Sequence, residues 1–334
     1  MEHIWQKISR KGVFFCLAPM INVTDTAFRQ IIAKYSRHGE NLGGPAVFWT
    51  EFVSADGIAS EAGREKVLRL LQFSKKEKPI IAQIFSAHPE KVKIACQIIS
   101  KLGFDGIDIN MGCPDKDVIK QGAGVALIRT PNLAREIIQA AKEGAPKLPI
   151  SVKTRLGYNT IEYKSWLPEI LKEGIAALTI HLRTKKEMSL VPAHWELAKD
   201  IVETVRAVDK NVVLIANGDV ETIADGKKKA LESGFDGVMI GRGIFGNPWL
   251  FDERRNLSGQ EKLPTVEEKL KALAEHTKLF EKLVDYRNFA IMKKHFKAYV
   301  SGFDGAKELR NELMQTNNAK EVAAMIAKFL KTHK

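Results

Sequence analysis

Cys113 lies in a turn where a thiol could take part in chemistry. The segment 106–114 (GIDINMGCP) starts as an apolar run typical of a buried strand and ends in a turn that contains Gly112 and Pro114. In α/β folds, reactive groups gather at the C-terminal ends of strands, whereas a structural cysteine belongs on an apolar face. The position of Cys113 therefore makes it a candidate catalytic residue.

Three roles are open to Cys113: nucleophile, general acid or passive thiol. A cysteine nucleophile normally needs a neighbouring base, and no Cys–His pair is visible near Cys113 in the sequence. A thiol with a near-normal pKa can instead donate a proton to a carbanion-like carbon. This role suits a reduction in which a flavin delivers hydride to one carbon and the enzyme protonates the next. Cys16 and Cys96 lie in apolar stretches and are expected to be core residues.

Polar or charged residues also follow the other apolar runs. Reading along the chain, the residues at these run ends are Pro19, Met20, Glu51, Gln83, Asn110, Lys153, His181, Arg183, Asn217, Gly218, Asp219, Gly241 and Arg242. Each has an ordinary explanation alone: Lys153 as a surface lysine with a packed stem, His181 as a satisfied core histidine. Such residues at so many strand ends indicate a functional site rather than polar groups that merely end each strand.

The last two strand ends are suited to a phosphate. Gly218 and Gly241 come directly after the seventh and eighth predicted strands, where barrels often bind phosphate through backbone N–H groups. Arg242 could add a charge-assisted clamp. Lys153 and Gln83 would lie on the barrel floor or wall and face a flat heterocycle. A phosphate at one end and a cation at the other suit flavin mononucleotide (FMN) better than a nicotinamide cofactor.

Eight short apolar runs, separated by helical stretches, must position these residues. They span 13–17, 47–52, 79–85, 106–109, 150–154, 177–181, 212–216 and 237–240. Most are continuously apolar, as expected for strands covered on both faces, and 89–102 and 131–143 are amphipathic helices. Eight β/α alternations in about 245 residues predict a (β/α)8 TIM barrel. The segment 103–107 (GFDGI) recurs as 234–238 (GFDGV), half a barrel away. A doubly wound open sheet is the alternative, but no Gly-x-Gly-x-x-Gly follows the first strand.

The C-terminal part of the chain has a different pattern. The composition of 252–266 is that of a linker, and Thr265 with Glu268 forms a capping-box pattern for the helix that follows. Helical periodicity then runs to the end, with a break at 302–305. The sequence therefore predicts a small helical domain after the barrel.

The net charge of +12 suggests a polyanionic partner, although a merely soluble basic protein is the plain alternative. Residues 262–334 contain 15 Lys and Arg against 9 Asp and Glu, which is half of the excess. Between Tyr286 and Phe303 there is no acid but a local basic patch of Arg287, Lys293, Lys294 and Lys297.

Several classes of protein are not expected. No apolar run approaches the roughly 20 residues that span a bilayer, and residues 1–7 lack the apolar core of a signal peptide. Three scattered cysteines are too few for a disulfide framework or a metal cluster. We expect a cytoplasmic monomer with reduced thiols, no metal and no membrane contact.

The motifs of this chain, taken in order, resemble those of the tRNA-dihydrouridine synthases over nearly the whole length. They are 18–20 (APM) with 24–29 (TDTAFR), 50–55 (TEFVSA), 83–85 (QIF), 110–114 (NMGCP), Lys120 with 122–124 (GAG), 152–157 (VKTRLG), 181–184 (HLRT), 217–219 (NGD) and 241–243 (GRG). The tail adds Lys294-His295-Phe296, Tyr299, Gly302 and Leu309-Arg310.

The resemblance implies an FMN-binding catalytic barrel over residues 1–252 and a helical tRNA-binding domain over 253–334, with NADPH as reductant. It implies that FMN is held by Pro19, Met20, Ile21, Gln83, Lys153, His181, Asn217, Gly218, Asp219, Gly241 and Arg242. It implies that Asn110 helps to hold the uracil, and it explains the basic patch as a surface for tRNA. The candidate residues for substrate and tRNA are therefore Asn110, Arg183, Arg287, Lys293, Lys294 and Lys297. Reduced flavin would give hydride to C6 of a uridine, and Cys113 would protonate C5. The uridine must leave its stack, at a cost of a few kcal/mol.

The chain departs from the family pattern at Leu182, in the run 187–192 and in the long insertion 39–45. These departures bear on the loops that touch tRNA. Two alternatives remain: an FMN barrel that reduces a free pyrimidine, of the dihydroorotate or dihydropyrimidine dehydrogenase type, and a non-catalytic RNA-binding protein or chaperone. The basic tail argues against the first, and Cys113 with Lys153 against the second.

Overall fold

The computed structural model describes residues 2–256 and 263–332. Its centre is a parallel sheet with the order β1-β9-β8-β7-β6-β5-β4-β2, in which β3 also pairs with β4. A parallel bridge between Cys16 and Val47 joins the two ends of this order, so the sheet closes into a barrel. The predicted TIM barrel is confirmed.

All eight predicted strands form. Their bounds are β1 (Phe14–Leu17), β2 (Phe48–Trp49), β3 (Val53–Ser54), β4 (Ile80–Phe85), β5 (Gly106–Met111), β6 (Ile150–Gly157), β7 (Ala177–Thr184), β8 (Val213–Asn217) and β9 (Gly237–Ile240). The second predicted strand is split into β2 and β3, and β6 and β7 each run three residues further than their apolar cores. Every residue of β4 and β5 is buried, because helices cover the outer face of the sheet.

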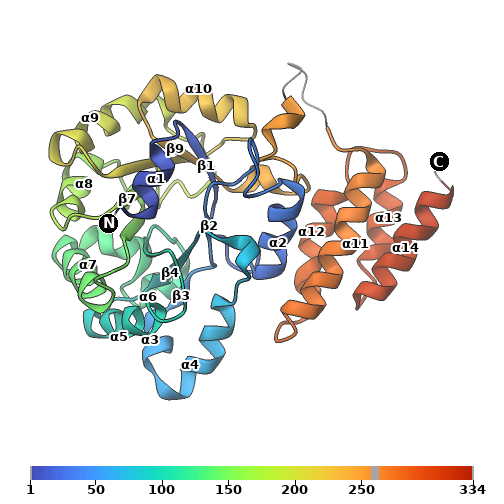
Figure 1. Ribbon diagram of the computed structural model, residues 1–334, viewed down its shortest axis with the longest axis horizontal. Coiled ribbons are helices and arrows are strands. Elements are labelled where there is room, and N and C mark those ends of the chain that lie inside the picture. The colour runs from blue at the N-terminus through green and yellow to red at the C-terminus, as the bar shows by residue number, and fades with distance from the viewer. Residues whose placement is uncertain (1, 257–262, 333–334) are drawn as a thin grey trace.

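Helices surround the barrel (Figure 1). They are α1 (Ile4–Ser9), α2 (Thr26–Tyr35), α3 (Ala55–Ala59), α4 (Glu61–Leu68), α5 (Pro89–Ile99), α6 (Lys116–Lys120), α7 (Pro131–Gly144), α8 (Tyr163–Leu171), α9 (Ala198–Val208) and α10 (Ile223–Ser233). The two predicted amphipathic helices are α5 and α7, and each begins with a proline in its first turn, where the missing N–H costs nothing. Helix α5 ends at Ile99, and Gly103 then turns the chain with φ of +84°.

The C-terminal region consists of helices, as predicted. These are α11 (Val266–Leu283), α12 (Lys293–Tyr299), α13 (Ala306–Leu313) and α14 (Ala319–Thr332). Thr265 and Glu268 form the expected capping box, and Gly302 and Gly305 adopt positive φ at the predicted break. Residues 257–262 of the predicted linker lie outside the described residues.

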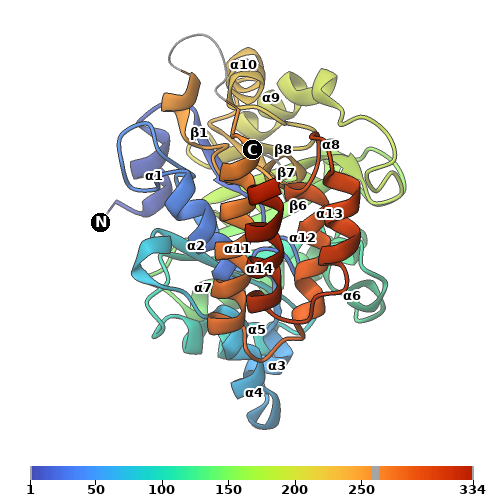
Figure 2. The same ribbon diagram turned by 90° about the vertical axis from the view of Figure 1, so that its right-hand side faces the viewer.

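The helical C-terminal region packs on one side of the barrel, with α11 against α2 (Figures 1 and 2). Its apolar core, in which Leu273, Phe280 and Phe296 are buried, also includes Ala27 of α2 and Trp249. Phe28 of α2 lies against that core, with its ring centroid 5.3 Å from that of His295. None of the helices in residues 2–256 and 263–332 has the length and apolar character needed to cross a bilayer.

Candidate active site at the barrel mouth

A cavity of about 720 Å³ opens at the C-terminal ends of β1, β6, β7, β8 and β9. Ten residues predicted from strand ends contribute to its lining: Pro19, Met20, Lys153, His181, Arg183, Asn217, Gly218, Asp219, Gly241 and Arg242. Residues scattered over more than 220 positions of sequence therefore converge on one cavity, at the end of the barrel where such enzymes place their chemistry.

Lys153 is a half-buried cation in the wall of the cavity. Its Nζ donates a hydrogen bond of 3.1 Å to Asn217 Oδ1, and the Asn217 amide in turn donates to the Met239 carbonyl at 2.9 Å. Burial, reinforced by the neighbouring Arg155 guanidinium, lowers the pKa of Lys153 to about 8. A half-buried cation held by a neutral amide is suited to contact an electron-rich or anionic atom of a ligand.

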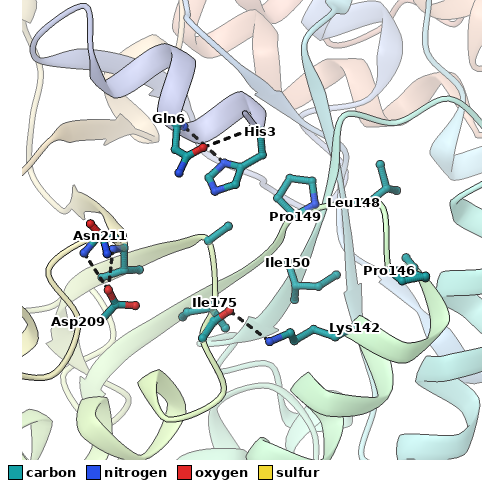
Figure 3. A pocket seen from close by; sticks show the side chains of 14 residues that line it. His3, Gln6, Lys142, Pro146, Leu148, Pro149, Ile150, Ile175, Asp209 and Asn211 are labelled. Carbon is teal, nitrogen blue, oxygen red and sulfur yellow. Dashed lines mark hydrogen bonds between the residues drawn. The ribbon is translucent and has the colours of Figure 1, made fainter. Parts of the chain in front are cut away.

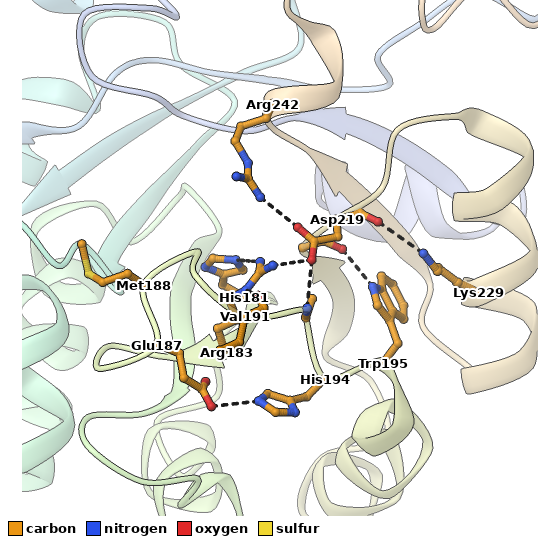
Figure 4. A network of polar contacts seen from close by, with 12 residues as sticks. His181, Arg183, Glu187, Met188, Val191, His194, Trp195, Asp219, Lys229 and Arg242 are labelled. Carbon is orange, nitrogen blue, oxygen red and sulfur yellow. Dashed lines mark hydrogen bonds and ion pairs between the residues drawn. The ribbon is translucent and has the colours of Figure 1, made fainter.

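Asp219 joins two arginines at the rim of the same cavity (Figure 4). One carboxylate oxygen accepts from Arg183 Nη2 and from the Ala193 N–H, and the other accepts from Arg242 Nη2 at 2.9 Å. Partial burial raises the pKa of Asp219, but the Ala193 N–H and the two guanidiniums outweigh it and hold the pKa below its ordinary value. Asp219 therefore stays ionised and fixes both arginines.

His181 is neutral in this setting. Burial, together with the charges of Arg155, Lys153 and Arg183, lowers the pKa of His181 well below its ordinary value. Arg183 Nη1 lies 3.2 Å from His181 Nε2. Because a guanidinium can only donate, Nε2 must accept, and the imidazole proton must be on Nδ1.

Gly218 lets the backbone pass close to this network. Its φ is +134°, and a Cβ atom at Gly218 would lie 2.8 Å from Ala193 Cβ and 3.3 Å from His181 Cδ2. Its carbonyl accepts from Trp195 Nε1 at 2.8 Å. Only glycine fits this position, where the chain crosses the mouth of the cavity.

The charges of the lining favour an anion. Four cations line the cavity, namely Lys153, Arg155, Arg183 and Arg242, against the two carboxylates of Asp219 and Glu221. Lys153 is half-buried in the wall, and Arg242 is exposed at the rim. A ligand with an electron-poor heterocycle at one end and a phosphate at the other fits this distribution.

Arg155 was not among the predicted site residues. It follows Lys153 by two positions on β6, so that both side chains point to the same face. Its Nε donates to the Gly112 carbonyl at 2.8 Å, and its Nη1 donates to the carbonyls of Thr184 and Met188, both at 3.1 Å. The alternation Lys153-x-Arg155 was the signal that could have found it.

Gln83 and Asn110 are not part of the cavity lining, although both were predicted at the site. The Gln83 side chain is fully buried, donates to Asp108 Oδ2 at 2.6 Å and accepts from Asn110 Nδ2 at 3.0 Å. Asn110 Oδ1 accepts from the N–H groups of Gly112 and Cys113 at 3.1 and 2.8 Å. The Gln83 and Asn110 side chains thus form a series of hydrogen bonds, outside the cavity lining, that fixes the turn containing Cys113.

Cys113 is half-buried in that turn. Burial raises the pKa of its thiol. The Asp115 N–H and the charges of Arg155 and Lys153 act to lower this pKa, but burial outweighs them. Gly124 packs on the same turn with φ of +61°, and a Cβ there would lie 3.0 Å from the Cys113 carbonyl oxygen. A thiol with a raised pKa keeps its proton at neutral pH, as a proton donor must and a thiolate nucleophile must not.

The remaining predicted residues lie outside the cavity. Ile21 is exposed beside it, Lys294 and Lys297 are exposed on α12, and Lys293 is half-buried. The side chain of Arg287 is only 11% exposed, because it forms an ion pair with Glu51.

A second cavity, of about 470 Å³, lies at the opposite end of the barrel beneath α1 (Figure 3). Its polar groups already have partners: Lys142 Nζ donates to the Glu173 carbonyl at 2.6 Å, Asp209 accepts from the Asn211 N–H at 2.8 Å, and His3 with Gln6 caps α1. Among the residues that the structure describes, no group of three or more His, Cys, Asp or Glu side chains could hold a metal ion.

The fold and the site together define a (β/α)8 barrel with an anion-attracting mouth. Residues 16–334 match the family model described as "Dihydrouridine synthase (Dus)". The chain belongs to the dihydrouridine synthase family.

Similar proteins cover almost the whole chain. The "Probable tRNA-dihydrouridine synthase" of Staphylococcus aureus (strain MRSA252) is 42% identical over 331 residues, which are 98% of this chain and 96% of that protein. The "Probable tRNA-dihydrouridine synthase 2" of Bacillus subtilis (strain 168) is 42% identical over 330 residues, 98% of this chain and 97% of that protein.

Two solved structures share the fold at low identity. Histamine dehydrogenase from Rhizobium sp. 4-9 superposes with a TM-score of 0.53 at 12% identity, over 79% of this chain and 48% of that chain. A complex of 2-naphthoyl-CoA reductase gives a TM-score of 0.52 at 13% identity, over 74% and 50% of the two chains. At these identities the likeness concerns the barrel alone.

Proposed function

We propose that this protein is a tRNA-dihydrouridine synthase, which reduces the C5–C6 bond of uridines in tRNA. One observation supports it most: a half-buried thiol with a raised pKa, Cys113, is held beside a cation-lined barrel mouth in a member of the dihydrouridine synthase family. The names of the relatives at 42% identity agree with this substrate.

The cavity residues would hold FMN. Lys153 would contact the flavin ring, and its positive charge would favour the electron-rich reduced form, with Asn217 fixing its ammonium group. The backbone at Gly218 and Gly241 and the guanidinium of Arg242 would hold the phosphate. Met20 and Pro19 would cover the ring from the β1 side. When bound, FMN that NADPH has reduced supplies hydride to C6 of the uracil.

Cys113 would complete the reduction as the general acid. Its S–H bond breaks as a C–H bond forms at C5, so hydride and proton together saturate the C5–C6 bond. The thiolate that remains is stabilised by the charges of Arg155 and Lys153, both of which act to lower the Cys113 pKa. Asn110 and Gln83 would keep the Cys113 turn in place through the hydrogen bonds behind the wall.

The two parts of the chain would divide the work. Residues 1–252 would form the catalytic barrel, and residues 253–334 would grip the RNA through phosphates and shape, with Lys293, Lys294 and Lys297 of α12 near the junction. We propose a cytoplasmic, monomeric enzyme that uses NADPH.

The proposal is tested with purified, FMN-loaded protein and NADPH. Unmodified tRNA, free uracil and orotate are offered separately, and the products are identified by mass spectrometry. We expect a mass gain of two hydrogens in tRNA and no efficient turnover of the free bases. Efficient reduction of uracil or orotate with tRNA ignored would assign the enzyme to free pyrimidines. A protein that takes up no FMN would favour a non-catalytic RNA-binding protein.

A further inference from the structure

The loop of residues 185–192, here called the rim loop, follows β7 at the edge of the active-site cavity. Ser189 of this loop contributes to the cavity lining. Residues 187–192 of the rim loop are also where the sequence departs from the family pattern.

The rim loop is held firmly by its backbone. Arg155 donates to the Met188 carbonyl at 3.1 Å, and Arg183 Nε donates to the Val191 carbonyl at 2.6 Å. Figure 4 shows Arg183 in this position, with the Met188 side chain pointing away from the polar network. Glu187 braces the loop through the Thr184 N–H at 2.7 Å and through His194 at 2.9 Å. The guanidiniums that line the cavity thus also fix the shape of its rim.

This rigid loop presents three large apolar side chains to solvent. Leu190 is 87% exposed, Met188 42% and Val191 37%. Leu190 is more exposed than any other large apolar residue in the described part of the chain. A single exposed apolar residue is ordinary, but three of them on four consecutive positions of an anchored loop, beside a functional cavity, point to a contact surface.

The surroundings of the apolar tip are basic. Lys186 is exposed, and Lys185 lies over the Tyr158 ring at 5.0 Å, with Arg129 over the same ring at 5.1 Å. Apolar side chains flanked by cations are complementary to nucleobases flanked by phosphates. A uridine that leaves its stack exposes the faces of the bases next to it, and aliphatic side chains can pack against such faces.

We propose that the rim loop packs Leu190, with Met188 and Val191, against the bases that neighbour the target uridine in the RNA. The contact helps to determine which uridine enters the cavity. This inference rests on the proposed function, because it assumes that a uridine in RNA is the substrate.

The test compares Leu190→Ala and Leu190→Asp with the wild type, and uses Leu231→Ala as a matched control. Leu231 is 67% exposed on α10, on the outside of the barrel. We expect the KM for tRNA to rise about fivefold in Leu190→Ala and more in Leu190→Asp. FMN content and NADPH oxidation without tRNA should stay unchanged in all three variants, and Leu231→Ala should match the wild type throughout.

The outcomes separate this inference from the proposed function. An unchanged KM for tRNA in both Leu190 variants, with an active wild type, overturns the inference alone. A wild-type enzyme that forms no dihydrouridine overturns the proposed function. If wild-type protein self-associates and Leu190→Asp is monomeric in gel filtration, with tRNA kinetics unchanged, the surface belongs to a second copy of the chain and the inference is wrong.

Discussion

Arg287 and Glu51 form an ion pair between the helical C-terminal region and the barrel, with Nη1 2.9 Å from Oε2 and 3.1 Å from Oε1. Both side chains are largely shielded from solvent, at 11% and 1% exposure. Glu51 also accepts from the Asn22 N–H, in the loop that supplies Pro19 and Met20 to the cavity. One carboxylate therefore connects the C-terminal helices to the wall of the active site.

The first prediction concerns stability. Arg287→Ala leaves the Glu51 carboxylate buried without its cation, so the free energy of unfolding should fall by about 3 kcal/mol. Urea unfolding followed by circular dichroism measures this change. Lys297→Ala, which removes an exposed cation from α12, serves as the control and should leave the unfolding midpoint within error. Equal stabilities of the two variants would mean that the ion pair contributes nothing to folding.

The second prediction concerns tRNA binding. Because the Arg287 charge is already paired, the exposed residues Lys294 and Lys297 should contribute more to the affinity for RNA. Replacing both with alanine should weaken binding of every tRNA alike and reduce the slope of log K against log salt by about 1–2. Fluorescence anisotropy across a salt series gives the slope. Lys101→Ala, at an exposed position after α5, is the matched control. An unchanged slope in the double variant would place the RNA on another face.

The third prediction concerns Cys113. Removal of a proton donor typically costs about 10²–10⁴-fold in rate, so Cys113→Ala should lose most dihydrouridine formation. Its FMN absorbance should be unchanged, because Cys113 does not line the cavity that would hold FMN. Its tRNA affinity should also be unchanged, because the RNA would be held chiefly through its phosphates and shape. Cys113→Ser, which keeps the size but is a weaker acid, should also be slow. Near-normal turnover by the alanine variant would remove Cys113 from the role of acid.

The fourth prediction concerns pH. The Lys153 pKa of about 8 means that the apoprotein loses this cation as the pH rises through about 8. FMN binds as an anion, so its affinity should fall above about pH 8, by up to tenfold per pH unit. Quenching of flavin fluorescence from about pH 7 to pH 9 measures this dependence. Lys153→Met should bind FMN more weakly and without the dependence, and a wild-type affinity that is flat over this range would contradict the proposed contact.

The same Lys153 pKa shift has the opposite effect on the stability of the apoprotein. The folded-state pKa of about 8 lies below the unfolded value of 10.5, so between these two pH values the unfolded chain binds more protons. The Lys153 contribution to the free energy of unfolding should therefore rise from about pH 8 to about pH 10.5. Urea unfolding of the wild-type and Lys153→Met apoproteins over this pH range measures the Lys153 contribution as the difference between the two. If the free energy of unfolding depends on pH in the same way in both proteins, the prediction is wrong.

The strands and many site residues could be predicted because their signal is local. Continuous apolar runs marked each strand, and parallel strands bring their C-terminal ends together, so Lys153, His181 and Asn217 could be expected to meet. Arg155 was missed because the strand was ended at residue 154, whereas β6 continues to Gly157. The polar residues after the apolar run still alternate between the two faces of the strand, so Arg155 points to the same face as Lys153.

Other relationships depend on register and docking, which the sequence does not encode locally. The pairing of Gln83 with Asp108 across β4 and β5 turns the Gln83 amide toward Asp108 and Asn110 rather than into the cavity lining. Arg287 and Glu51 are 236 positions apart, and their contact exists only because the C-terminal helices pack beside α2. The charges in the sequence identify Arg287 as part of a basic patch, but they do not show that it forms an ion pair with Glu51.

The most direct test of the central claim is a map of dihydrouridine in tRNA from cells from which the gene has been deleted. The deleted strain is complemented with the wild-type gene, with Cys113→Ala or with an empty vector. We predict that specific dihydrouridines disappear on deletion, return with the wild-type gene and stay absent with Cys113→Ala produced at an equal level. An unchanged dihydrouridine map after deletion would contradict the claim that this protein reduces uridines in tRNA.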